Sequence, residues 1–92
     1  MRIGKVIGTI TATRKDERLT GSKLLLTQPI KSDGKPSGEA LVAVDTVGAG
    51  IGETVLFATG AASRHAANQP QSPIDAAIVG IVDTIDLATK NR

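Results

Sequence analysis

Apolar and polar positions alternate over several short segments of the chain, and Gly, Pro or polar clusters separate these segments. Ile, Val and Thr are frequent in the first segment, and β-branched residues favour strands. Gly4 and Gly8 interrupt it, so we expect the strand to bend there or another backbone to approach closely. The pattern predicts five strands, over residues 2–14, 23–29, 39–45, 53–60 and 74–87.

The segments between the predicted strands have the composition of turns, apart from one. Residues 15–21, KDERLTG, read as a solvated polar connection, and residues 31–38, KSDGKPSG, read as a flexible turn. Residues 61–69 are rich in Ala, the best helix former, and predict a short helix. Five short strands with one short helix predict a mainly β fold, a small closed or nearly closed barrel.

The last predicted strand is the longest apolar segment of the chain. Periodicity alone does not separate a strand from a helix in such a run, so a helix over residues 75–88 is the alternative. As a strand, the segment is apolar on both faces, and an apolar outward face needs cover. One short helix cannot cover several strands, so we expect another subunit to contribute. One face carries Val79, Ile81, Ile85 and Leu87, and the other carries Ile78, Gly80 and Val82.

The composition describes a small domain with little core material. The 92 residues predict a single domain over residues 1–92. Phe57 is the only aromatic residue, so the large rings that usually anchor a small core are missing. Burial of more surface between copies would compensate, which favours oligomerisation. The chain has no cysteine, which excludes disulfides and thiolate sites and fits a reducing compartment.

The charge of the chain is small and scattered. The formal net charge is +2, and Lys and Arg do not cluster as they do in a tail that binds nucleic acid. The N-terminal residues lack the pattern of a signal peptide. No apolar run approaches the roughly 18 residues of a spanning helix. We therefore expect a soluble protein of the cytoplasm.

Three glycines at alternate positions, Gly48, Gly50 and Gly52, pose the question of phosphate binding. A dinucleotide fingerprint needs G-x-G-x-x-G between a strand and a helix, whereas here the spacing is G-x-G-x-G and a strand follows. No helix N-terminus is placed to receive a phosphate. Glu53 and Thr54 stand where a Walker loop needs Lys and Ser or Thr. The remaining readings are a tight turn with positive φ angles, or a bare backbone that another subunit can approach.

No catalytic constellation is evident. His65 is the only histidine, and Ser63 lies two positions from it, a spacing at which side chains on a helix do not face each other. The aspartates show no metal-binding cluster. We expect Asp45 and Asp75 to accept backbone N–H groups in turns, and Arg64 to pair with one of them.

Nucleic-acid binding is the alternative function for a small five-stranded barrel. Surfaces that bind single strands combine aromatic stacking platforms with a basic groove. This chain offers one Phe inside an apolar run and no basic stripe. A second alternative, a small enzyme or ligand-binding protein that uses the glycines, depends on the phosphate reading above.

Several segments in order, at these spacings, resemble one known family. GKVIGTITATRK at residues 4–15 and KLLL at 23–26 are similar to its N-terminal part, and AVDTVGAGIGETVL at 43–56 is the most specific element. GAASR at 60–64 stands where GSSAR is more usual, and PIDAAIVGIVD at 73–83 is similar to its closing strand. The chain resembles the EutN/CcmL family of bacterial microcompartment vertex proteins.

The resemblance implies a five-stranded barrel related to the OB fold, assembled as a homopentamer. Such pentamers cap the vertices of a polyhedral shell in the bacterial cytoplasm, whose facets are hexamers. The implied role is structural, with no catalytic residue, no cofactor and no metal. The turn at 31–38 and the tail at 88–92 carry no family signature.

The resemblance also suggests which residues make contacts. Ser63 and Arg64 are expected at the edge that meets hexamers, since a planar guanidinium can bond several carbonyls. A second group forms either part of that edge or a pore loop at the five-fold axis, and the sequence does not choose between them. This group is Gly48, Ala49, Gly50, Ile51, Gly52 and Glu53.

Overall fold

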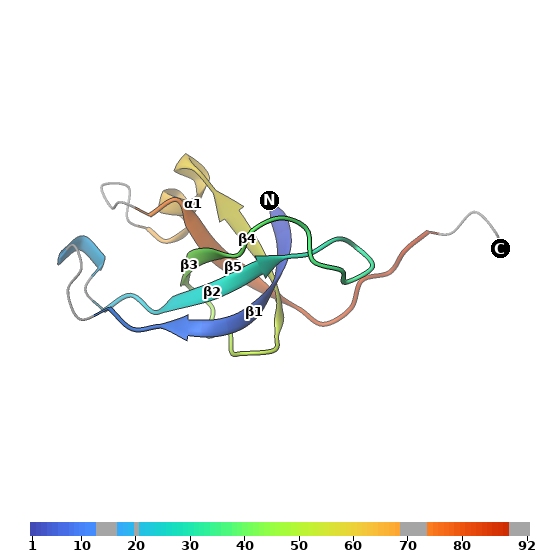
Figure 1. Cartoon of the computed structure of the whole chain (residues 1–92). Helices are drawn as coiled ribbons and strands as arrows, with labels where there is room; N and C mark the ends of the chain where they lie inside the picture. The colour runs from blue at the N-terminus through green and yellow to red at the C-terminus, as the bar shows by residue number, and fades with distance from the viewer. Residues whose placement is uncertain (13–16, 20, 69–73, 89–92) are drawn as a thin grey trace.

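The protein folds as a closed five-stranded barrel with one short helix (Figure 1). The structure is a computed structural model, and it describes residues 1–12, 17–19, 21–68 and 74–88. In chain order the elements are β1 (Arg2–Ile10), the 3-10 turn η1 (Glu17–Leu19), β2 (Leu24–Pro29), β3 (Leu41–Asp45), β4 (Thr54–Thr59), α1 (Ala61–Ala66) and β5 (Ala76–Val82). The mainly β barrel with one short helix is confirmed.

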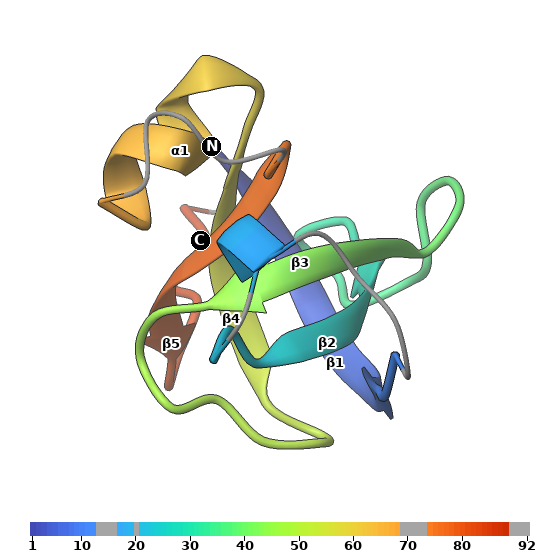
Figure 2. The same ribbon diagram turned by 90° about the vertical axis from the view of Figure 1, so that its left-hand side faces the viewer.

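Strand pairing runs in the order β1-β2-β3-β5-β4 and returns to β1. The pairs are antiparallel except β3 and β5, which are parallel and meet only at Val44↔Ala77 and Asp45↔Ile78. The register of β1 against β2 shifts between Val6 and Gly8, which confirms the bend expected near the second glycine. α1 lies against the region of β4 and β5 (Figure 2).

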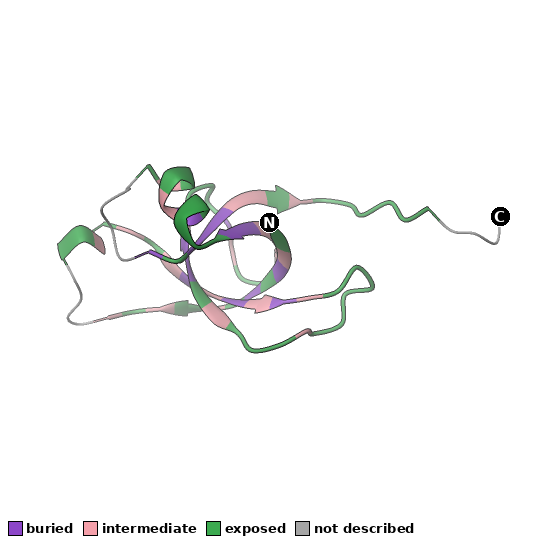
Figure 3. Cartoon of the chain, turned by 90° about the horizontal axis from the view of Figure 1, so that it is seen from above, coloured by how far each residue is buried: buried purple, intermediate pink, exposed green. Residues whose placement is uncertain are grey.

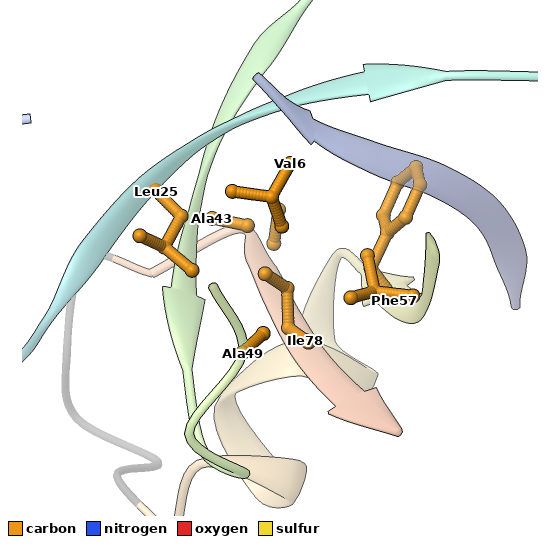
Figure 4. Packing of buried hydrophobic residues seen from close by; sticks show 8 residues of the cluster. Val6, Leu25, Ala43, Ala49, Phe57 and Ile78 are labelled. Carbon is orange, nitrogen blue, oxygen red and sulfur yellow. The ribbon is translucent and has the colours of Figure 1, made fainter. Parts of the chain in front are cut away.

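The core of the barrel is small, as the composition indicates. It is formed by aliphatic side chains and a single ring, and three of its members are alanines. Figure 4 shows these side chains converging from the strands and from the connection between β3 and β4. The cluster comprises Val6, Leu25, Ala43, Ala49, Val55, Phe57, Ala76 and Ile78.

Two predicted strands end earlier than the pattern suggested. The strand expected over 74–87 is β5, which ends at Val82, and the helix alternative over 75–88 is wrong. Val82 pairs with Thr54, the first residue of β4, so no partner strand remains beyond it. β1 likewise ends at Ile10, which pairs with Leu24, the first residue of β2. A strand needs a partner as well as an apolar pattern.

The connections are mostly as predicted. Glu17 and Arg18 are exposed on η1, while residues 15 and 16 lie outside the described residues. Residues 31–38 form a largely exposed turn in which the Lys35 N–H donates to Asp33 Oδ1 at 2.9 Å. Of the tail at 88–92, only residue 88 is described. The helices among the described residues are too short to cross a membrane.

The second expectation for β1, a close backbone approach, is confirmed at Gly4. A Cβ added there would lie 2.7 Å from Thr27 Cγ2, 2.9 Å from Phe57 Cε1 and 3.2 Å from the Gln28 carbonyl oxygen. At Gly8 the nearest atom would be Leu26 Cβ at 3.7 Å, an ordinary contact. Only the first glycine is therefore required by packing.

Replacing Gly4 by alanine will lower the free energy of unfolding by about 1–3 kcal/mol, because overpacking shifts the backbone or the ring. Gly8→Ala is the matched control on the same strand, and we expect it to change stability by less than about 0.5 kcal/mol. Denaturant titration of both variants measures the difference. Equal effects would contradict the close packing at Gly4.

Candidate functional site

The glycine loop, residues 46–53, joins β3 to β4 and is held at its start by Asp45. The carboxylate is nearly buried, with its side chain 2% exposed. Its Oδ1 accepts the Val47 N–H at 3.1 Å and its Oδ2 accepts the Ala49 N–H at 3.0 Å. This confirms the prediction that Asp45 accepts backbone donors in a turn.

Lys23 adds a second anchor to the same segment. Its Nζ donates to the Ala49 carbonyl oxygen at 2.8 Å and lies 3.7 Å from Asp45 Oδ2. The methyl group of Ala49 is fully buried in the core. The middle of the loop is thus fixed by a carboxylate, an ammonium and a packed side chain.

The far end of the loop is closed by Glu53. Its Oε1 accepts the Gly50 N–H at 2.7 Å, and its own N–H donates to the Gly50 carbonyl oxygen at 3.1 Å. Val6 of β1 pairs with both sides of this turn, accepting from the Gly52 N–H at 2.8 Å and donating to the Glu53 carbonyl oxygen at 3.0 Å. Gly48 and Gly52 have φ angles of 80° and 91°, where a Cβ is disfavoured.

These hydrogen bonds count against the hypothesis that the glycine loop binds a phosphate. A phosphate cradle presents several backbone N–H groups to the ligand. In this loop the N–H groups already bonded within the chain are those of Thr46, Val47, Ala49, Gly50, Gly52 and Glu53. A strand, β4, follows the loop, as the sequence predicts. The loop is a rigid turn and is not built to bind an anion.

The outer surface of the loop is apolar and nearly bare. Ile51 is 65% exposed and Val47 is 40% exposed, although both side chains are large and apolar. A Cβ added at Gly50 would meet only Glu53 Oε1, at 3.5 Å, so the space around this glycine is otherwise open. The loop therefore offers a fixed backbone and two exposed aliphatic side chains to whatever lies against it.

The second pair of predicted contact residues lies on α1, and both are joined to the start of β5. Ser63 is fully buried, and its hydroxyl donates to the Gly60 carbonyl oxygen at 2.5 Å, with the Ile74 carbonyl oxygen 3.4 Å away. Arg64 is half-buried, and its Nη1 donates to the same Ile74 oxygen at 3.2 Å. Asp75 contributes its carbonyl oxygen, which accepts the Gly60 N–H at 2.9 Å.

These contacts differ from two expectations. The guanidinium of Arg64 bonds a carbonyl oxygen and not the carboxylate of Asp45 or Asp75. Asp75 uses its backbone and not its side chain to accept a turn donor. The hydroxyl of Ser63 is buried, so it is not accessible to a neighbouring molecule. The structure also separates the two predicted groups, since the glycine loop and α1 lie at opposite ends of the barrel in Figures 1 and 2.

The described residues do not form a site for catalysis, for metal binding or for stacking on nucleic-acid bases. No three His, Asp or Glu side chains among them are placed to hold a metal ion. His65 is exposed on α1, whereas Ser63 is buried, so the two do not form a nucleophile and base. Phe57 is fully buried and cannot stack on a nucleic-acid base.

One anchoring residue was missed by the sequence reasoning. Lys23 stands at the start of a predicted strand, yet it bonds the Ala49 carbonyl oxygen of the glycine loop, 26 positions away. Its contact depends on the pairing of β2 with β3, which brings Leu24 opposite Val44. A single sequence carries no signal for such a long-range contact.

Comparison with known proteins identifies the family to which this barrel belongs. The family model described as ethanolamine utilisation protein EutN/carboxysome matches residues 1–83. The bacterial microcompartment shell vertex protein GrpN of Rhodospirillum rubrum is 48% identical over 86 residues, which cover 94% of this chain and 97% of that protein. The carboxysome shell vertex protein CcmL of Thermosynechococcus vestitus is 48% identical over 85 residues, which cover 92% of this chain and 86% of that protein.

The likeness extends to three dimensions. The solved structure of the GrpN pentameric microcompartment shell protein from Rhodospirillum rubrum matches with a TM-score of 0.87 at 46% identity. The match covers 96% of this chain and 100% of that one. Fold, length and sequence agree over nearly the whole chain, and this chain belongs to the EutN/CcmL family.

Proposed function

We propose that this protein is a structural shell component, five copies of which form a ring that caps a vertex of a bacterial microcompartment. The observation that carries the proposal is the match of nearly the entire chain to a pentameric shell protein at 46% identity. The described residues add no competing chemistry. The role is to build the shell and not to catalyse a reaction.

The exposed apolar residues of the barrel support assembly. Ile7, Val42 and Ile81 lie on three different strands and are 47%, 44% and 38% exposed. Residues of this kind gain free energy when a neighbouring copy removes them from water, at about 25 cal/mol per Å² of apolar surface. A head-to-tail interface closes into a ring when its rotation allows it. In the ring, a neighbouring copy thus covers the exposed apolar residues of these strands.

The vertex role follows from geometry. A sheet of hexamers is flat, and it closes into a polyhedron only where five-fold positions replace six-fold ones. A pentamer whose outer edge fits hexamers supplies such a position. The contact with hexameric shell proteins is therefore the second interface that this protein must provide.

We assign the glycine loop to the hexamer-facing edge. Its backbone is fixed by internal hydrogen bonds, so little conformational entropy is lost when a partner binds. Ile51 and Val47 supply exposed apolar surface, and Gly50 leaves room for a close approach. Arg64 contributes from the other end of the barrel, and Ser63 serves by holding α1 in place. The alternative is that the loop lines the five-fold axis.

Replacing Gly50 by glutamine tests this assignment. The φ angle at this glycine is not in the left-handed region, and a Cβ meets only one carboxylate oxygen, so the barrel will tolerate the side chain. We expect native mass spectrometry to show unchanged pentamers, while co-expression with hexameric shell proteins yields at least tenfold fewer closed shells. Gly50→Ala is the control, with near-normal closure.

Other outcomes are equally informative. Pentamers that dissociate would place the loop inside the ring. A monomeric unsubstituted protein would contradict the vertex function itself.

A further inference from the structure

The chain leaves the barrel after β5 as an extended, exposed segment. This exit segment, residues 83–88, projects away from the barrel in Figures 1 and 3. Ile85 is 39% exposed and Leu87 is 53% exposed. Side chains two positions apart in an extended chain point the same way, so these two form one apolar face and Asp86 lies on the other.

An apolar groove lies at the opposite end of the barrel. Its volume is about 190 Å³, somewhat more than a cavity that accepts benzene. Among the described residues, Asp75 is the only charged one in its lining, and these residues do not supply the convergent polar groups of a small-molecule site. A space of this size suits aliphatic side chains. Its apolar lining is Leu19, Leu24, Val42, Val44, Ile74 and Ala76.

The exit segment does not fill the groove of its own chain, because it runs away from the barrel. The groove lies at the first residue of β5, Ala76, and the segment leaves from the last, Val82. Six steps along a strand span about 20 Å. Ile85 can return at most about 10 Å from Val82, and Leu87 at most about 17 Å, even without a turn. A second copy has no such restriction.

We infer that the exit segment of one copy docks in the groove of its neighbour, with Ile85 and Leu87 as the inserted side chains. The inference deepens the proposed function, on which it rests, by naming a contact that holds the ring. Each copy then gives a segment on one side and receives one on the other. This is a heterologous contact, the type that generates rings.

Cysteine crosslinking tests the docking directly, because the natural chain contains no cysteine. The variant Leu87→Cys/Val42→Cys places one thiol on the segment and one in the groove, both at exposed positions. A disulfide requires Cα atoms within about 7 Å. Mild oxidation followed by denaturing electrophoresis is expected to give a ladder of covalent multimers up to five copies.

The matched control moves the second thiol out of the groove. Leu87→Cys/Val47→Cys uses the glycine loop, where Val47 is 40% exposed, and we expect at least tenfold less crosslinking. Mixing the two single variants, Leu87→Cys and Val42→Cys, should give covalent dimers across the proposed contact. Larger covalent multimers should not form, because each chain then carries only one thiol. A disulfide between the two thiols of the same chain, which would leave covalent monomers, would overturn docking between copies.

Polar substitution gives an independent measure. Ile85→Ser/Leu87→Ser is expected to raise the concentration at which rings dissociate by at least tenfold, whereas Thr84→Ser/Asp86→Asn leaves it unchanged. Intact pentamers without crosslinks above the control would overturn this inference alone. An unsubstituted protein that is monomeric in native mass spectrometry would overturn the proposed function as well, so the two failures are distinguishable.

Discussion

Replacing Phe57 by alanine will lower the free energy of unfolding by about 3–5 kcal/mol. The ring is fully buried and is the only aromatic group in the chain, so no neighbouring ring can fill the space that it leaves. The surrounding side chains are aliphatic and include three alanines, which are too short to close a cavity. A domain of this size has a total stability of only about 5–15 kcal/mol, so the loss is a large share.

Urea titration followed by circular dichroism measures the effect. The rings must be compared at several protein concentrations, because assembly stabilises the folded chain by mass action. Phe57→Leu, which keeps most of the volume, should lose clearly less than the alanine variant. Ile51→Ala is the control for an exposed apolar residue, and it should change stability by less than about 0.5 kcal/mol. Equal losses for the two alanine variants would contradict the central place of the ring.

The course of the strands was predictable from the sequence because their chemistry is local. Alternating Ile, Val and Thr between glycine-rich or polar connections predicts short strands, and each predicted strand is present. The ends were not predictable in the same way. Ile10 and Val82 end their strands because their partners, Leu24 and Thr54, begin there. That register depends on the whole barrel, which a local pattern does not contain.

The same division applies to the glycine loop. Its spacing and the strand after it were sufficient to reject a phosphate site, and an aspartate before a turn was sufficient to predict a cap. The burial of Ala49 and its bond with Lys23 were not predictable, because both depend on strands that are distant in sequence.

The residues of α1 show most clearly what a local sequence pattern does not predict. Ser63 and Arg64 were expected to contact a neighbouring shell protein because they are polar and match a family segment. In the structure both lie beside the Ile74 carbonyl oxygen, with Ser63 Oγ at 3.4 Å and Arg64 Nη1 at 3.2 Å. The buried Ser63 therefore serves the fold of its own chain, whereas the half-buried Arg64 keeps its place in the proposed edge. Only the geometry separates the two roles.

Replacing Asp45 by alanine will have the second large effect, on the glycine loop more than on the barrel. The substitution removes the acceptor of the Val47 and Ala49 N–H groups and the carboxylate beside Lys23. Two hydrogen bonds to a charged group are lost, and water entering the loop restores part of their free energy, so we expect a cost of about 2–4 kcal/mol. The amides of Val47 and Ala49 should lose their protection from hydrogen exchange.

Two further variants separate the carboxylate from the ion pair. Asp45→Asn keeps one acceptor oxygen and should fall between the alanine variant and the natural protein. Lys23→Met keeps the aliphatic stem but loses the bond to the Ala49 carbonyl, and it should cost no more than about 1 kcal/mol because the lysine is half exposed. If the loop is the hexamer-facing edge, shell closure will fall in the same order as the protection of the Val47 and Ala49 amides. If shells close normally with the Asp45→Ala variant while its Val47 and Ala49 amides are unprotected, contact with hexamers does not depend on the conformation of this loop.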